Sequence, residues 1–218
     1  SRALGLHVAA ARELFEEAGI LFADTKPGVD LAAVRKALLA KTPAGKHSPP
    51  PSAFVEALAE AEAALRLDAL VPLSRWITPE VETSRFDTHF FVAELPPGQS
   101  ASHDDTEGTT SLWLPPARAI EDNATGVIRL PPPTLRTLEC VGAFSDVASV
   151  LADARSRKPP VLRPQLVIRE GGRFSLVLPG APEHPEPGPV IAGTTCFLVR
   201  EDGSWFSARP EEVPPVAA

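Results

Sequence analysis

Hydrophobic residues recur at three- and four-residue steps through the first third of the chain, which is the period of amphipathic helices. One such stripe runs through residues 3–18 and ends at Gly19, a typical residue after a helix C-terminus. Asp30 is expected to cap the N-terminus of a second helix that ends at Lys41. Ser52 is expected to cap a third helix that extends to about Leu67. The inward positions are Leu4, Val8, Ala11, Leu14, Phe15 and Ala18, then Leu31, Val34 and Leu38, then Phe54, Leu58, Ala61 and Leu65.

After residue 70 the pattern becomes that of strands and shorter helices. Glycine-containing turns at Gly171-Gly172 and Asp202-Gly203 separate apolar runs and predict two hairpins. The helical start, mixed middle and β-rich end together predict an α/β or α+β domain. The expected elements are strands at 70–77, 86–95 and 109–114, a short helix after Pro115-Pro116, helices at 134–143 and at 145–156 with Ser145 as cap, and hairpins at 165–169 with 173–178 and at 194–200 with 204–207.

Charge and composition narrow the class of protein. The net charge of −7 disfavours sequence-independent binding to nucleic acids, which depends on clustered Lys and Arg. No apolar run approaches the roughly 20 residues that span a bilayer, and the first residues lack the shape of a secretory signal. We therefore expect a cytoplasmic protein that binds neither nucleic acid nor membrane. Cys140 and Cys196 have no metal-ligand spacing and are expected to be buried free thiols.

Three glutamates gather near the end of the first predicted helix. At about 100° per residue, Glu13 and Glu17 face the same way with Glu16 beside them, opposite the apolar stripe. Carboxylate oxygens are the ligands that Mg²⁺ prefers. Arg12 lies one turn before Glu16 and can hold that carboxylate in one orientation. A solvated helix face is the alternative interpretation.

Residues 12–20, R-E-L-F-E-E-A-G-I, match the second half of the Nudix signature at every position, so the chain resembles the Nudix hydrolase superfamily. The resemblance implies hydrolysis of a nucleotide-linked diphosphate with bound Mg²⁺ or Mn²⁺. By motif position it implies that Glu13, Glu16 and Glu17 bind the metal. It also implies that Glu16 and Arg12 belong to the catalytic set, with Arg12 orienting the ligands.

The first half of the signature departs from the family pattern. Leu4 stands where a contiguous motif has a glutamate, and the motif's glycine would fall before residue 1. One branch of the superfamily carries a long insertion inside the motif, and this chain contains no Met, so we expect that an N-terminal part is missing. The alternative is a catalytically inactive Nudix module that binds a nucleotide or a protein. A glycine and a glutamate in register upstream would favour the enzyme.

Further motifs resemble one subgroup of the superfamily. R-W-I-T-P at 75–79, R-F-D-T-H-F-F at 85–91, and L-P-G at 178–180 followed by E-H-P at 183–185 resemble proteins related to nucleoside diphosphate-linked moiety X motif 19. That subgroup includes coenzyme A diphosphatases. It therefore implies hydrolysis of CoA or acyl-CoA to phosphopantetheine species and adenosine 3′,5′-bisphosphate. NADH and ADP-ribose stay open as substrates.

An acidic loop supplies further candidates. Glu107 lies six residues before Trp113 and resembles a loop glutamate of this fold that acts as general base or extra metal ligand. A merely polar loop is the alternative interpretation. Asp104 and Asp105 are lesser candidates.

The R-F-D-T-H-F-F segment holds polar residues on a predicted strand. Asp87 and His89 would share one face, as a metal or polar site, with a structural role for Asp87 favoured by the subgroup resemblance. Arg75 or Arg85 could contact substrate phosphates, because Arg suits bidentate phosphate binding.

These observations predict a Nudix-type α/β/α sandwich. We expect a single domain over residues 1–218, with a helical insertion at 29–67 and a C-terminal elaboration at 131–218. The expected partner is a small-molecule nucleotide diphosphate, and a homodimer is left open.

Overall fold

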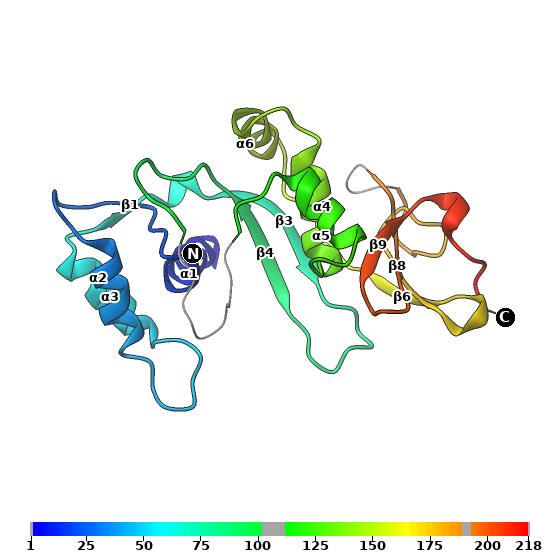
Figure 1. The fold of residues 1–218 in the computed structure, drawn as a ribbon, viewed down its shortest axis with the longest axis horizontal. Coiled ribbons are helices and arrows are strands. Elements are labelled where there is room, and N and C mark those ends of the chain that lie inside the picture. The colour runs from blue at the N-terminus through cyan, green and yellow to red at the C-terminus, as the bar shows by residue number, and fades with distance from the viewer. Residues whose placement is uncertain (1, 102–111, 189–192, 218) are drawn as a thin grey trace. The chain divides into compact units, whose positions relative to one another are not determined.

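Helices and three separate β-sheets make up the chain in this computed structural model, which describes residues 2–101, 112–188 and 193–217. Figure 1 shows the helical beginning, the strand pair that follows it and the β-rich end. The chain divides into two compact units, one formed by residues 1–71 with 93–113 and the other by residues 72–92 with 114–218. None of the described helices is both long and apolar enough to cross a membrane.

The first unit is a helical cluster with a two-stranded antiparallel sheet. Phe15, Leu38 and Phe54 come from three different helices and meet in one buried core, with the rings of Phe15 and Phe54 6.5 Å apart. The third predicted helix is shorter than expected, because the chain turns at Glu62 (φ +47°) and its next residues pair with β1. The elements are α1 (Arg2–Ala18), β1 (Ala23–Asp24), α2 (Leu31–Leu39), α3 (Pro51–Glu60), β2 (Ala64–Leu65) and a 3-10 turn (Leu67–Ala69).

Helix caps in this unit confirm one sequence prediction and correct another. The Asp30 carboxylate accepts the backbone N–H groups of Ala32 and Ala33 at 3.0 and 3.1 Å, as predicted for an N-cap. Ser52 is not a cap. The third helix begins at Pro51, because proline lacks an N–H and its fixed φ suits the first helical position.

The second unit carries a three-stranded sheet in the order β4-β3-β5 and a four-stranded antiparallel sheet in the order β6-β7-β8-β9. β5 runs parallel to β3, and α4, α5 and α6 lie between β4 and β5 in the chain, as a parallel crossover requires. Both predicted hairpins are confirmed. The elements are β3 (Val71–Ile77), β4 (Asp87–Val92), α4 (Pro116–Ala124), α5 (Pro132–Gly142), α6 (Val147–Ser156), β5 (Val161–Leu162), β6 (Gln165–Ile168), β7 (Phe174–Val177), β8 (Cys196–Val199), β9 (Trp205–Ala208) and 3-10 turns at Glu170–Gly172 and Pro210–Glu212.

A single apolar cluster links the helices and both sheets of this unit. Trp76 of β3, Leu135 of α5, Leu162 of β5 and Phe197 of β8 are buried in it together. The core therefore depends on residues that lie up to 121 positions apart, from Trp76 to Phe197.

One helix cap predicted for this unit is wrong. Helix α6 is capped by Asp146 rather than Ser145, because the Asp146 carboxylate accepts the backbone N–H of Ser149 at 2.7 Å. Residues 109–111 of the strand predicted at 109–114 lie outside the described residues, and its other half, residues 112–114, is not in a strand.

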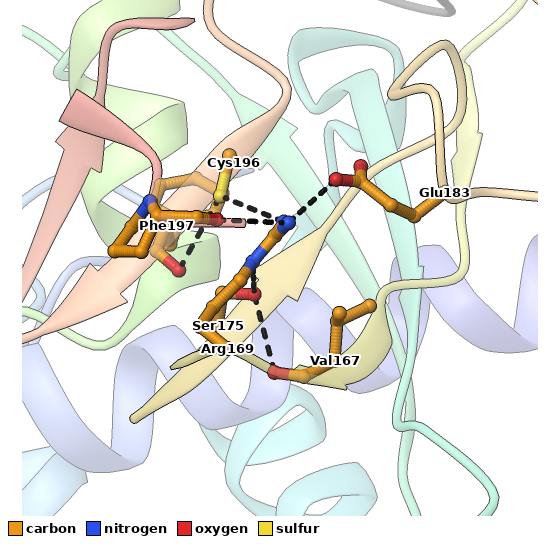
Figure 2. Close-up of polar contacts among 7 residues, drawn as sticks. Val167, Arg169, Ser175, Glu183, Cys196 and Phe197 are labelled. Atoms are coloured by element: carbon orange, nitrogen blue, oxygen red, sulfur yellow. Dashed lines mark hydrogen bonds and ion pairs between the residues drawn. The ribbon is translucent and has the colours of Figure 1, made fainter. Parts of the chain in front are cut away.

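A buried arginine organises the four-stranded sheet (Figure 2). Arg169 is 1% exposed, and its guanidinium donates to Ser175 Oγ at 2.8 Å and to Glu183 Oε1 at 2.5 Å. It also lies 3.8 Å from the sulfur of Cys196, so it connects both hairpins with the loop between them. Both cysteines are free thiols, Cys196 buried and Cys140 half-buried.

Candidate metal-binding helix

The C-terminal half of α1 carries the predicted glutamates. Ala11 and Phe15 are buried as expected, whereas Leu4 is 56% exposed and does not extend the buried stripe. Glu16 is only 5% exposed, so the prediction that all three glutamates lie opposite the buried face is wrong for this residue. The reason is angular, because Glu16 is about 100° from Phe15 around the helix and therefore lies on the flank of the packed face.

Arg12 lies between the carboxylates, as its spacing predicts. Its Nε is 3.4 Å from Glu16 Oε1, and its terminal nitrogen is 3.6 Å from Glu13 Oε1. A buried carboxylate is costly unless a cation or hydrogen bonds compensate it. The pair with Arg12 therefore holds Glu16 in one orientation, while the side chain of Glu13 stays 59% exposed.

The end of α1 is fixed by an arginine that the sequence analysis did not single out. Arg35 of α2 is 7% exposed and donates to the carbonyl oxygen of Glu16 at 3.0 and 2.7 Å and to that of Glu17 at 2.8 Å. A cation at a helix C-terminus also complements the helix dipole. The sequence could have indicated Arg35, because it is a charged residue that follows Val34 on the otherwise apolar face of α2.

The segment that leaves α1 is held by a side-chain amide. Gln99 Oε1 accepts the backbone N–H of Leu21, and Gln99 Nε2 donates to the carbonyl of the same residue, both at 2.8 Å. Gly19, with φ +71°, makes the turn out of the helix and donates to the Phe15 carbonyl at 3.1 Å. The α1 exit is therefore fixed by α2 on one side and by residue 99 on another.

The three carboxylates are the right donor type for a hard divalent cation. In the part of the chain that the structure describes, however, no three His, Cys, Asp or Glu side chains are gathered as a ready-made metal site. Glu16 is turned onto Arg12, and Glu13 and Glu17 are exposed. Asp104, Asp105 and Glu107 lie outside the described residues.

Asp87 forms an ion pair on the three-stranded sheet. Both of its carboxylate oxygens accept from Arg75, at 2.6 Å each, and this pairing raises the pKa of the Arg75 guanidinium. His89 Nε2 lies 3.7 Å from Asp87. The bidentate pair agrees with a structural role for Asp87 and occupies the guanidinium that could have contacted phosphate.

Arg85 lies on the loop between β3 and β4. Its Nε donates to the Thr78 carbonyl at 3.4 Å, and its guanidinium is 3.8 Å from Glu80. The loop closes where the backbone N–H of Phe86 donates to Thr78 Oγ1 at 3.0 Å. The W-I-T-P and R-F-D-T motifs therefore meet at the base of this loop.

The family model described as the NUDT19 Nudix domain matches residues 2–141, which include α1 and both strand motifs. The chain belongs to this family. Two curated relatives carry the name "Acyl-coenzyme A diphosphatase NUDT19". The one from Xenopus laevis is 31% identical over 152 residues, 64% of this chain and 40% of its own length. The one from Homo sapiens is 28% identical over 155 residues, 67% of this chain and 41% of its own length.

The chain thus spans about two fifths of the length of these relatives of the NUDT19 Nudix family. Among solved structures, a NUDIX hydrolase from Alicyclobacillus acidocaldarius superposes with a TM-score of 0.55 and 22% identity, over 67% of this chain and 64% of that one. This likeness confirms the predicted α/β Nudix fold.

Proposed function

We propose that this chain is the catalytic domain of a divalent-metal-dependent diphosphatase that hydrolyses a nucleotide-linked diphosphate, with CoA or acyl-CoA as the substrate. The observation that carries the proposal is the Arg12–Glu16 pair on α1, within the segment that the NUDT19 Nudix family matches. The names of the two relatives, both acyl-coenzyme A diphosphatases, support the substrate class.

In this proposal Glu13, Glu16 and Glu17 supply the metal ligands, and Arg12 orients Glu16. The bound Mg²⁺ or Mn²⁺ would offset charge on the diphosphate oxygens and lower the pKa of the attacking water. Glu107 keeps its sequence-based role as general base or extra ligand. The domain limits predicted from the sequence, with an insertion at 29–67 and an elaboration at 131–218, are part of the same proposal.

The test is a substrate screen in the presence of Mg²⁺ or Mn²⁺. CoA, acyl-CoA, NADH and ADP-ribose are incubated with the chain, and products are separated by chromatography. Glu17→Gln is the main variant, because Glu17 is exposed and its loss should leave the fold intact. Glu16→Gln is the second, and Glu56→Gln, an exposed glutamate of α3 paired with Lys41, is the matched control.

We expect phosphopantetheine species and adenosine 3′,5′-bisphosphate from CoA, a fall in rate of about 100-fold or more in both site variants, and no fall in the control. If NADH or ADP-ribose is hydrolysed and CoA is not, the proposed substrate class is overturned, whereas the proposed diphosphatase activity stands. Binding of these nucleotides without turnover by any folded form would favour the inactive Nudix module instead.

A further inference from the structure

The second unit contains a pocket of about 880 Å³, and none of the residues that line it belongs to α1. It is built where α5, the end of α6, the chain before β8 and strand β9 come together. Its polar lining includes Arg136, Cys140, Lys158, Thr194 and Ser207. We propose that this pocket binds a phosphate monoester of a small organic molecule.

Arg136 provides the first reason. Its side chain is 4% exposed and lies over the ring of Phe197, 5.2 Å from the centroid. One terminal nitrogen is 2.9 Å from Glu139, and the other donates to the carbonyl of Thr194 and, at 2.8 Å, to its hydroxyl. The Nε–H is buried and has no hydrogen-bond partner among the described residues.

Ser207 provides the second reason, from a different element. Its Oγ, on β9, is also buried without a hydrogen-bond partner among the described residues. Buried polar atoms in folded proteins are nearly always hydrogen bonded, so each unpaired one needs an explanation. Two such donors lining one pocket are explained together by a ligand that accepts from both.

The charge of the pocket selects an anion. Its lining holds three cations, Arg136, Arg157 and Lys158, against two carboxylates, Glu139 and Asp153, which leaves one net positive charge. Each carboxylate forms an ion pair with an arginine of the pocket, Glu139 with Arg136 at 2.9 Å and Asp153 with Arg157 at 2.7 Å. Among the described residues, the buried Glu139 Oε2 accepts no hydrogen bond beyond that ion pair. The ammonium of exposed Lys158 is therefore the charge that an incoming anion would neutralise.

The shape and the remaining walls define the rest of the ligand. A phosphate has three terminal oxygens and can accept from Arg136 Nε, Ser207 Oγ and the Lys158 ammonium, which come from three separate segments. Ala143, Phe144 and Pro160 supply an apolar wall for an attached organic group. Burial raises the pKa of the Cys140 thiol, so that it stays neutral and does not repel an anion.

This site does not depend on the diphosphatase activity, because no residue of α1 lines it. The two proposals can therefore fail separately. If the proposed activity holds, both of its products are phosphate monoesters and belong to the ligand class of the pocket.

The half-buried Cys140 offers a direct test, because it lines the pocket while Cys196 is buried. The rate at which a thiol reagent labels Cys140 is measured by mass spectrometry with adenosine 5′-monophosphate, adenosine or inorganic phosphate added. We expect adenosine 5′-monophosphate to slow labelling in a saturable way and adenosine to have no effect. Inorganic phosphate should protect more weakly, because it does not use the apolar wall.

Two variants separate binding from folding. Ser207→Ala removes a hydroxyl that makes no hydrogen bond among the described residues, so the melting temperature should stay equal or rise while the Kd for adenosine 5′-monophosphate rises about tenfold. Lys158→Gln should also raise the Kd. Ser175→Ala is the matched control, because Ser175 Oγ accepts from Arg169 and donates to the Val167 carbonyl. It should lower the melting temperature and leave the Kd unchanged.

Absence of protection by adenosine 5′-monophosphate at millimolar concentration would overturn the proposal. Equal protection in the unmodified chain, Ser207→Ala and Lys158→Gln would also overturn it, because the ligand would then lie elsewhere.

Discussion

At the scale of single residues, buried arginines each connect segments that lie far apart in the sequence. Arg35, on α2, donates hydrogen bonds to the C-terminal carbonyl oxygens of α1. Arg169 joins two hairpins and the loop that carries Glu183. Since a buried guanidinium left without partners is costly, each contact constrains both of the segments that it joins.

Replacing Arg35 with Met should weaken the first unit. The variant leaves the Glu16 and Glu17 carbonyl oxygens without these donors, and such losses cost about 1–3 kcal/mol of unfolding free energy. Urea unfolding measures the difference. Lys36→Met, at the exposed neighbouring position, is the control and should change the unfolding free energy by about 0.5 kcal/mol or less. Equal losses of unfolding free energy in the two variants would contradict the role of Arg35 at the C-terminus of α1.

Glu183 should make stability depend on pH in the acid range. The hydrogen bond from Arg169 holds the pKa of Glu183 below its ordinary value. Because the depressed pKa belongs to the folded state, the stabilisation is complete above the ordinary pKa and is lost as the pH falls through the folded value.

Urea midpoints from pH 7 downward should therefore fall more steeply for the unmodified chain than for Glu183→Gln. Glu201→Gln, an exposed carboxylate of the same unit, should keep the steep profile. Parallel profiles for the unmodified chain and Glu183→Gln would show that the pair does not stabilise the fold.

At the scale of elements, local pattern predicted most helices and both hairpins, because their signals lie within a few residues. The cap of α2 and the positive φ values at Gly171 and Gly172 are such local signals. The two-residue strands β1, β2 and β5 were missed, since they are defined by partners up to 86 positions away, as in Arg75 with Val161. Ser52 and Ser145 were wrong as caps because a neighbouring residue took the position in each case.

The cap assignments can be tested by alanine substitution. Asp30→Ala and Asp146→Ala each remove an acceptor of backbone N–H groups and should lower the unfolding free energy by about 1 kcal/mol. Ser52→Ala should be neutral or slightly stabilising, because it lies inside α3 where alanine is the better helix former. A larger loss at Ser52 than at Asp30 would restore the original assignment.

At the scale of the whole molecule, a contact can be predicted from the sequence only when the contacting residues lie close together along the chain. The Arg12–Glu16 pair follows from a four-residue spacing and was predicted. The contact of Gln99 with Leu21 spans 78 positions, and no spacing rule brings these residues together. The pocket beside Arg136 likewise needs α5 and β9 to be packed before its unpaired donors can be recognised.

The central claim is that α1 binds a divalent cation through its glutamates. Titration of Mn²⁺ into the chain, followed by the electron paramagnetic resonance signal of the free ion, tests it without requiring turnover. We expect saturable binding that Glu17→Gln weakens by about tenfold or more and that Glu56→Gln leaves unchanged. Equal Mn²⁺ affinity in all three forms, or no binding by the folded chain, would contradict the claim.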